Sequence, residues 1–252
     1  MYIYGHRGAK GVAMENSLQG FQLAAAHGID RFELDVRLSS DNELVVVHDE
    51  HLKRLANSNL RVSRTSKDLL FNTHLKGTNQ GIPTLEQVIL ACPNVVHWQF
   101  EIKTDKTNLN FVSPMLTLIN KHNLQDKVII TSKHVGILSA FMQANPKIKR
   151  GYVQEWPLPH GLHVAKRLNC SMLALNKSLA RKRYIQKAQQ KGLHVSIWTV
   201  NDADDMAQFY RLGADSIISD YPQAAKEVIS HLSATATAPQ SVKALQNEAA
   251  SN

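Results

Sequence analysis

Residues 31–48 read RFELDVRLSSDNELVVVH, and this stretch decides how many strands the chain can place in a parallel sheet. It contains two strand-like runs, 31–38 and 43–48, with only turn-forming residues between them. A parallel crossover needs about a dozen residues or more. The two runs must therefore form an antiparallel hairpin, and they contribute one strand, not two, to any parallel sheet.

The rest of the chain alternates short strand-like runs with segments of helix length. The further strand-like runs are 2–5, 95–103, 127–132, 149–154, 171–176, 193–200 and 215–219. Helix-length segments such as 17–27 and 181–191 lie between them, and a glycine follows each of these two, as helix C-termini favour. Such alternation predicts parallel strands joined by crossover helices. Eight strands remain for the ring, and we predict a closed TIM (β/α)8 barrel rather than an open sheet.

The chain length fits one barrel. It has 252 residues, and such domains typically have about 250. We assign residues 1–233 to this single domain. Residues 52–80 are polar and irregular in pattern, which indicates a small insertion after the hairpin. Residues 234–252 read ATATAPQSVKALQNEAASN, and we expect this small, polar segment to be a flexible C-terminal tail.

Composition excludes several classes of protein. Hydrophobic residues make up 43% and charged residues 20% of the chain, which supplies a real core and excludes a disordered protein. Cys92 and Cys170 are far apart and form no CxxC, so neither a zinc ribbon nor a disulfide scaffold is expected. No run approaches ~20 apolar residues, which predicts no transmembrane segment. Without a signal-peptide pattern we expect a cytoplasmic protein.

The net charge of +8 favours an anionic partner, although a solvated basic surface would give the same value. The densest basic run, 181–183, has no aromatic residues interleaved with it. Stacking platforms for single-stranded nucleic acid need such residues. We therefore expect a small phosphorylated ligand or an anionic lipid rather than nucleic acid.

Two pairs of chemically active residues lie at the ends of the first two strand-like runs. His6 and Arg7 follow the first run, at the barrel end where active sites are built, and could also be a plain strand-end turn. Glu33 and Asp35 are two residues apart on the second run, so both carboxylates face the same side. Two buried carboxylates repel unless a cation lies between them, and water or a neighbouring lysine is the alternative to a metal.

A further histidine and a Glu–Lys pair end the next two runs. If the hairpin pairs residue 38 with residue 43, His48 lies beside Glu33; alone, it could be a buried histidine bonded to a turn. Glu101 and Lys103 share one face of the 95–103 run. They are candidates for a third oxygen ligand and a phosphate contact, or for a simple internal ion pair.

Taken together, these residues predict one type of site. Three carboxylates favour a hard cation, Mg²⁺ or Ca²⁺, over Zn²⁺, because the chain has neither paired thiolates nor an HExxH motif. Two histidines, an arginine and a lysine beside such a cation are suited to cleaving a phosphate ester. The cationic groups neutralise the phosphoryl oxygens, and the histidines carry protons to and from the attacking and leaving oxygens.

An ordered set of short motifs runs along the chain: His6-Arg7-Gly8, Met14-Glu15-Asn16-Ser17, Glu33-Leu34-Asp35-Val36, Val47-His48-Asp49, Ile82-Pro83-Thr84-Leu85-Glu86, Glu101-Ile102-Lys103, Trp198-Thr199-Val200-Asn201 and Ile218-Ser219-Asp220. With these motifs the chain resembles the glycerophosphodiester phosphodiesterase family over residues 2–225. Met14 and Ser17 replace the usual Pro and Thr. The stretch 52–57 also diverges from the family pattern, which leaves the substrate preference open.

The resemblance implies a TIM barrel with a role for each residue of the site. It implies that His6 and His48 are the catalytic pair. It implies that Glu33, Asp35 and Glu101 bind the metal, and that Arg7 and Lys103 hold the phosphate. It also implies that Glu15 and Asn16 reach the substrate, although Asn16 with Gln19 equally resembles a capping box of the first helix. Trp198 is expected to line the pocket for the alcohol or glycerol moiety, or else to be a core-edge tryptophan with a bonded N–H.

By this resemblance, we expect hydrolysis of a glycerophosphodiester to sn-glycerol 3-phosphate and an alcohol such as choline or ethanolamine. The alternative is a lipid phosphodiesterase of the same fold with lysophospholipase D-like activity. An inactive binding protein would have no use for the acid–base pair. The sequence does not distinguish Mg²⁺ from Ca²⁺, assign the acid and base roles to the two histidines, or indicate an oligomeric state.

Overall fold

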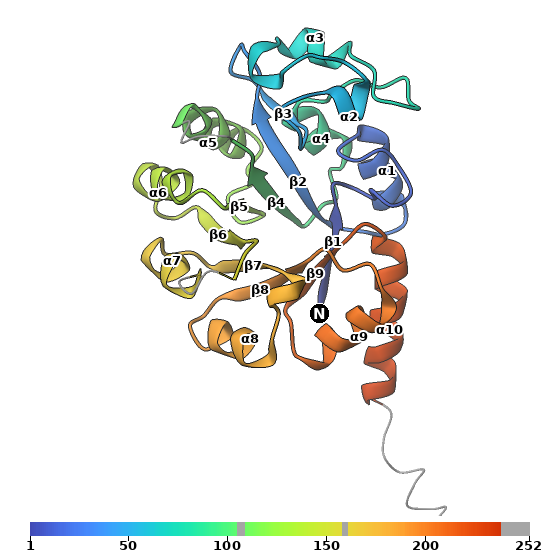
Figure 1. Ribbon diagram of the computed structural model, residues 1–252, viewed down its shortest axis with the longest axis vertical. Helices are drawn as coiled ribbons and strands as arrows, with labels where there is room; N and C mark the ends of the chain where they lie inside the picture. The colour runs from blue at the N-terminus through green and yellow to red at the C-terminus, as the bar shows by residue number, and fades with distance from the viewer. Residues whose placement is uncertain (105–108, 158–160, 238–252) are drawn as a thin grey trace, which may run out of the picture.

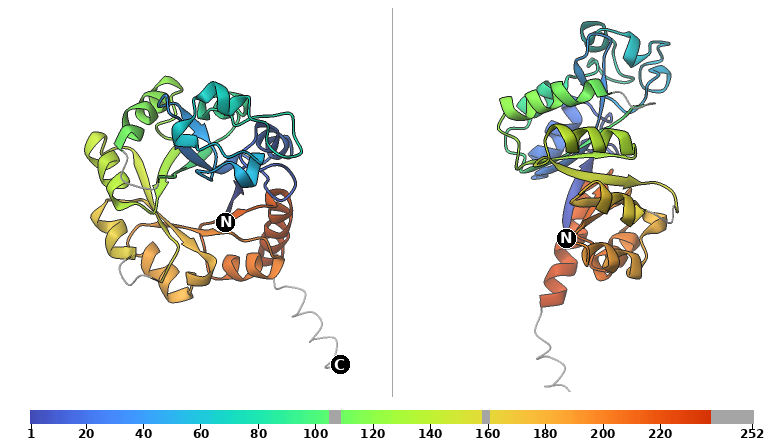
Figure 2. Two further views of the ribbon diagram at one scale, coloured as in Figure 1. Left: turned by 45° about the horizontal axis from the view of Figure 1, so that its top comes forward. Right: turned by 90° about the vertical axis from the view of Figure 1, so that its left-hand side faces the viewer.

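All nine strand-like runs form strands in the computed structural model, which describes residues 1–104, 109–157 and 161–237. The strands are β1 (Tyr2–His6), β2 (Arg31–Leu38), β3 (Leu44–Val46), β4 (His97–Ile102), β5 (Val128–Ser132), β6 (Lys149–Gln154), β7 (Met172–Asn176), β8 (His194–Trp198) and β9 (Ser216–Ser219). Eight are parallel and pair in the order β1-β9-β8-β7-β6-β5-β4-β2, and a β1–β2 pairing closes the ring. The predicted TIM barrel is confirmed (Figure 2).

Helices surround the ring of strands (Figures 1 and 2). They are α1 (Leu18–Ala26), α4 (Leu85–Ala91), α5 (Val112–Lys121), α6 (Val135–Ala144), α7 (Gly161–Arg167), α8 (Lys182–Gln189), α9 (Ala203–Arg211) and α10 (Pro222–Thr237), with short 3₁₀ helices η2 (Leu109–Phe111) and η3 (Lys177–Leu179). The glycines predicted to end two helices, Gly28 and Gly192, have φ of +74° and +76°. This left-handed conformation is open to glycine without a steric penalty.

Alternation along the strands separates the apolar core from the polar lumen. On β2, Leu34 and Val36 are fully buried and pack into the apolar layer between the strands and the helices. Glu33 and Asp35 alternate with these two residues, so their side chains lie on the opposite face of the strand, and they are also buried. The period of two therefore places both carboxylates inside the ring, as the sequence predicted.

The hairpin has a different register from the one predicted. Leu38 pairs with Leu44 instead of residue 43. The Ser39 N–H donates to the Glu43 carbonyl at 3.0 Å, so the turn consists of the three residues 40–42. The Asn42 N–H donates to the Ser39 carbonyl at 3.1 Å, and Asn42 has φ of +60°. A hydrogen bond of this kind, followed by a left-handed residue, is the pattern that is common in three-residue hairpin loops.

The inserted segment between the hairpin and α4 is less irregular than its sequence suggests. It contains α2 (Lys53–Ala56), the 3₁₀ helix η1 (Val62–Arg64) and α3 (Lys67–Phe71), and lies at the top of Figure 1. A small apolar cluster of its own joins it to β3 and includes Val45, Leu52, Leu55, Val62 and Leu70. The segment therefore has a fixed position above one side of the barrel.

At the C-terminus, α10 continues to Thr237, four residues into the segment expected to be a tail. The rest of that segment, 238–252, lies outside the described residues. Across the described ranges no helix combines the length and the apolar character needed to span a membrane.

A buried arginine joins β6 to the ends of two helices. Arg150 is 1% exposed, and its guanidinium donates to five backbone carbonyls, those of Asn145, Pro146, Ile148, Leu168 and Asn169. The first three carbonyls follow or end α6, and the last two follow α7. Arg150 thus supplies hydrogen-bond donors to backbone carbonyls of the segments that follow these two helices.

We expect Arg150→Met to lower the free energy of unfolding by about 3 kcal/mol, because buried carbonyls without a donor cost about 1–3 kcal/mol each when left unpaired. Urea denaturation measures the loss. Lys149→Met, at an exposed neighbouring position, is the matched control and should change stability by less than about 0.5 kcal/mol. An equal effect of both variants would contradict the structural role of Arg150.

Candidate active site

The candidate active site lies at the C-terminal ends of β1, β2 and β4. The strand register places His6 of β1 opposite Glu33 of β2, and Asp35 of β2 opposite Glu101 of β4. All four side chains are buried. Pairing between neighbouring strands therefore brings together residues that are far apart in the sequence, at the barrel end where active sites are built.

Three carboxylates form the centre of the site. Glu33, Asp35 and Glu101 each present an oxygen, and these oxygens lie within 4.8 Å of one another. Burial and the charges of Asp35 and Glu101 raise the pKa of Glu33 well above its usual value. Among the described residues, Glu33 Oε2 and Asp35 Oδ1 are buried without a hydrogen-bond partner. Oxygens in this condition fit a hard divalent cation.

Two cationic side chains lie against these carboxylates. Arg7 Nε is 2.9 Å from Asp35 Oδ2, and Lys103 Nζ is 2.7 Å from Glu101 Oε1 and 3.4 Å from Asp35 Oδ1. Burial opposes both charges, but the carboxylates raise the pKa of Arg7 and of Lys103 above their usual values. The internal Glu101–Lys103 pair considered from the sequence is therefore present. Both side chains remain charged.

His6 is held by a residue from the other end of the chain. Its Nδ1 donates to Asp220 Oδ1 at 2.5 Å, and Asn201 Nδ2 donates to Asp220 Oδ2 at 2.8 Å. Burial alone would raise the pKa of Asp220, but the hydrogen bond and charge of His6, with Asn201, lower it to about 2. The fixed Nδ1–H leaves Nε2 on the cavity side, 3.8 Å from Glu33 Oε2.

His48 has a similar arrangement with its own sequence neighbour. Its Nδ1 donates to Asp49 Oδ1 at 2.7 Å. Burial lowers the pKa of His48, so the neutral ring is favoured near neutral pH. The chain reaches this position because the Val47 N–H donates to the Asp35 carbonyl at 3.0 Å, which returns the hairpin to the barrel mouth. The site therefore assembles in spite of the register shift.

No role for Asp220 or Asp49 was predicted from the sequence, although both lie in the quoted motifs. The signal was available for Asp49, because an acidic residue directly after a candidate histidine can orient its ring. For Asp220 the partnership spans 214 residues and follows only from closure of the ring between β1 and β9. Two histidines with anchored Nδ1 atoms are suited to proton transfer at Nε2.

The capping box that was one of the two interpretations of Asn16 is absent, and the helix N-cap is the next residue. Ser17 has extended backbone angles, and its hydroxyl accepts from the Gly20 N–H at 3.0 Å. Asn16 instead has φ of +55°, and its Nδ2 donates to Asp35 Oδ2 at 2.9 Å. Glu15 accepts from Arg7 NH1 at 2.8 Å. Both residues therefore belong to the site.

A cavity of about 200 Å³ joins these groups. Its lining includes His6, Arg7, Glu33, His48, Glu101, Lys103 and Trp198. Trp198 Nε1 is buried and has no hydrogen-bond partner among the described residues, so the interpretation of Trp198 as a core-edge residue with a bonded N–H is wrong. Glu155, which the sequence did not indicate, also lines this cavity and an adjoining one of about 430 Å³.

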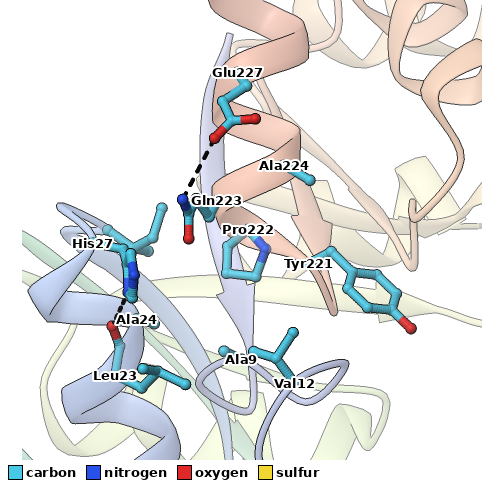
Figure 3. A pocket seen from close by; sticks show the side chains of 11 residues that line it. Ala9, Val12, Leu23, Ala24, His27, Tyr221, Pro222, Gln223, Ala224 and Glu227 are labelled. Atoms are coloured by element: carbon cyan, nitrogen blue, oxygen red, sulfur yellow. Dashed lines mark hydrogen bonds between the residues drawn. The ribbon is translucent and has the colours of Figure 1, made fainter.

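A more apolar groove lies outside the barrel between α1 and α10 (Figure 3). It has a volume of about 420 Å³, and Val12, Leu23, Tyr221 and Pro222 are among its lining residues. The hydrogen bond of His27 to the Leu23 carbonyl lies within the α1 region, on its own side of the groove. None of the residues that line this groove belongs to the candidate active site.

Comparison with known proteins agrees with the motifs. A family model described as the glycerophosphoryl diester phosphodiesterase family matches residues 6–224. A glycerophosphodiester phosphodiesterase of Caldanaerobacter subterraneus subsp. tengcongensis is 26% identical over 242 residues, which cover 88% of this chain and 94% of that protein. A human lysophospholipase D is 24% identical over 273 residues, covering 91% of this chain and 86% of that protein.

A solved structure supports the same relationship. A phosphodiesterase of Oleispira antarctica, in complex with the product sn-glycerol-3-phosphate, has a TM-score of 0.86 and 25% identity, with 91% of this chain and 97% of that one covered. The family model spans nearly the whole barrel, from His6 into α10. The chain therefore belongs to the glycerophosphoryl diester phosphodiesterase family.

Proposed function

We propose that this glycerophosphodiester phosphodiesterase hydrolyses its substrates to sn-glycerol 3-phosphate and an alcohol, with a divalent cation and a histidine pair. The observation that carries the proposal is the cavity itself. Two histidines with Nδ1 atoms fixed by aspartates line it together with two carboxylates of the buried cluster. The Oleispira antarctica relative, whose structure holds sn-glycerol-3-phosphate, supports this choice of product.

Glu33, Asp35 and Glu101 would hold the cation, either Mg²⁺ or Ca²⁺, since both take carboxylate oxygens. When bound, the ion supplies positive charge that stabilises the phosphoryl oxygens during displacement. Arg7 and Lys103 bind the phosphate from the same side, because each already lies against a carboxylate of the cluster. Asn16 fixes Asp35 Oδ2, so that carboxylate keeps its orientation.

The two histidines would transfer the protons. The neutral imidazole takes a proton at Nε2 from the attacking oxygen, which belongs either to water or to the 2-hydroxyl of the substrate. The protonated imidazole gives its Nε2 proton to the oxygen of the leaving alcohol. Attack by the 2-hydroxyl gives a cyclic phosphate, which water then opens with the proton flow reversed. Trp198 lines the part of the cavity suited to the glycerol or alcohol moiety.

The second candidate is a lysophospholipase D activity. The human relative of that name aligns over 91% of this chain, and the net charge of +8 would favour an anionic lipid surface. The same residues would perform the same chemistry on a lysolipid, so the two candidates differ in the group that the cavity mouth accepts.

The test is release of sn-glycerol 3-phosphate from glycerophosphocholine and glycerophosphoethanolamine, with Mg²⁺, with Ca²⁺ and with chelator. We expect release with a cation and its loss with chelator. Lysophosphatidylcholine, followed by choline release, is the parallel substrate. Release from the lysolipid alone would favour the second candidate, and release that chelator does not reduce would contradict the metal assignment.

A further inference from the structure

Arg54, on α2 of the inserted segment, contacts two acidic residues of the barrel mouth. Its Nε donates to Asp49 Oδ2 at 2.6 Å. Its NH1 and NH2 donate to Glu15 Oε2 and Oε1, each at 2.8 Å. All three guanidinium nitrogens are therefore engaged, with a bidentate fork on one carboxylate and a single bond to the other.

The two acidic residues each hold a group of the proposed mechanism. Asp49 accepts the Nδ1 proton of His48 with its other oxygen, and Glu15 accepts from Arg7 NH1. Hydrogen bonds thus run without interruption from His48 through Asp49, Arg54 and Glu15 to Arg7. One residue of the insertion joins the acid–base histidine to the phosphate-binding arginine.

The two carboxylates that Arg54 contacts are more buried than Arg54 itself, so its loss would leave two shielded charges without this donor. The side chains of Glu15 and Asp49 are 5% and 24% exposed, whereas that of Arg54 is 51% exposed. Burial opposes ionisation of Glu15, but the hydrogen bonds and charges of Arg54 and Arg7 hold its pKa below the usual value. Arg54 therefore neutralises two shielded carboxylates from the solvent side, and its own removal leaves no cavity in the core.

We propose that Arg54 is a positioning residue, through which the docked insertion fixes the orientation of the His48 ring by holding Asp49. This inference rests on the proposed function for its kinetic consequence. Arg54 is not among the residues that line the cavity. The fork geometry of a guanidinium is needed to hold Glu15 and Asp49 at once.

The effect should fall more on kcat than on KM. Arg7 has a second partner, since its Nε is 2.9 Å from Asp35 Oδ2, so the phosphate contact stays in place without Arg54. His48 depends on Asp49, whose second oxygen would lose its donor. A loosely held general acid or base slows the chemical step while substrate binding is little changed.

The kinetic test compares Arg54→Ala, Arg54→Lys and Lys53→Ala. We expect Arg54→Ala to lower kcat by about 10- to 100-fold, the cost of a small misplacement of a catalytic group, and to change KM by less than about threefold. Arg54→Lys should restore part of kcat, because one ammonium can reach one carboxylate. Lys53→Ala removes an exposed cation from the same helix and should match the wild type.

A double-mutant cycle separates positioning from general damage. If Arg54 acts through Asp49, Arg54→Ala in an Asp49→Asn background should cost less than threefold further in kcat. Multiplicative effects, a kcat for Arg54→Ala within twofold of the wild type, or an equal loss in Lys53→Ala would each overturn the proposal. Melting temperatures within about 2 °C of the wild type would show that the variants are folded.

An NMR measurement of the His48 Nδ1 proton does not depend on catalytic activity, so it tests this inference separately from the proposed function. In ¹⁵N-histidine-labelled protein, the His48 Nδ1 proton should give a downfield resonance, assigned by its loss in His48→Ala. We expect that resonance to weaken in Arg54→Ala and to remain in Lys53→Ala. An unchanged resonance in Arg54→Ala would refute positioning, even if the wild type cleaved no glycerophosphodiester. Inactive wild-type protein with the expected resonances would refute the function and not the positioning.

Discussion

Changing His6 or His48 to alanine is expected to lower kcat for glycerophosphodiester hydrolysis by about 10²- to 10⁴-fold in each case. The reason is that each ring has its Nδ1 fixed by an aspartate, at 2.5 Å for His6 and 2.7 Å for His48, which leaves Nε2 for the substrate. One ring takes a proton and the other gives one. Loss of either therefore stops a step that the remaining ring cannot perform alone.

The fold should survive both substitutions, because His6 and His48 line the solvent-connected cavity and are not part of the apolar core. Steady-state kinetics with saturating cation, together with thermal melting, measure the two effects separately. His27→Ala on the outer groove is the matched control and should have wild-type kcat. Near-normal turnover in His6→Ala or in His48→Ala would exclude that histidine from the acid–base pair.

Replacing Glu101 with glutamine should raise the cation concentration needed for half-maximal activity by more than about 100-fold. Loss of a group that only supports a metal ligand already costs about 10–100-fold, and Glu101 is proposed as a ligand itself. The substitution keeps the size of the side chain and removes one of the three carboxylates whose oxygens lie within 4.8 Å of one another. Lys103 keeps a carboxylate partner in Asp35, at 3.4 Å.

Titration of activity with Mg²⁺ and with Ca²⁺ measures this shift. Glu155→Gln is the control, because Glu155 lines the same cavity but does not belong to the carboxylate cluster. The cation concentration that gives half-maximal activity of this variant should stay within threefold of the wild-type value. A midpoint for Glu101→Gln equal to that of the wild type would remove Glu101 from the proposed ligand set.

The barrel could be predicted from the sequence because its signals are local. The period of two that places Glu33 and Asp35 on one face belongs to any strand, and eight such runs separated by helix-length segments favour a closed ring. The hairpin register was missed by one residue. It depends on the left-handed conformation of Asn42, which SSDN permits but does not require.

The supporting contacts of the site were harder to predict for a different reason. The residues of the site follow from strand ends, whereas their partners come from loops whose positions depend on the finished fold. Arg54 reaches Glu15 across 39 positions of sequence, and this contact depends on how the insertion packs on the hairpin. At the start of α1, Asn16 and Ser17 are both good N-caps, and the contact of Asn16 with Asp35 decides between them.

The hydrogen bond between His6 and Asp220 has a consequence for biosynthesis. It joins the first strand of the ring to the residue that follows the last one, so the two partners are translated at opposite ends of the barrel-forming sequence. His6 is among the first residues to be synthesised, but its ring cannot be oriented until Asp220 has left the ribosome and β9 has paired with β1. We therefore expect prematurely terminated chains to contribute no phosphodiesterase activity to the cell, so that the hydrolytic site appears only when synthesis of the barrel is complete.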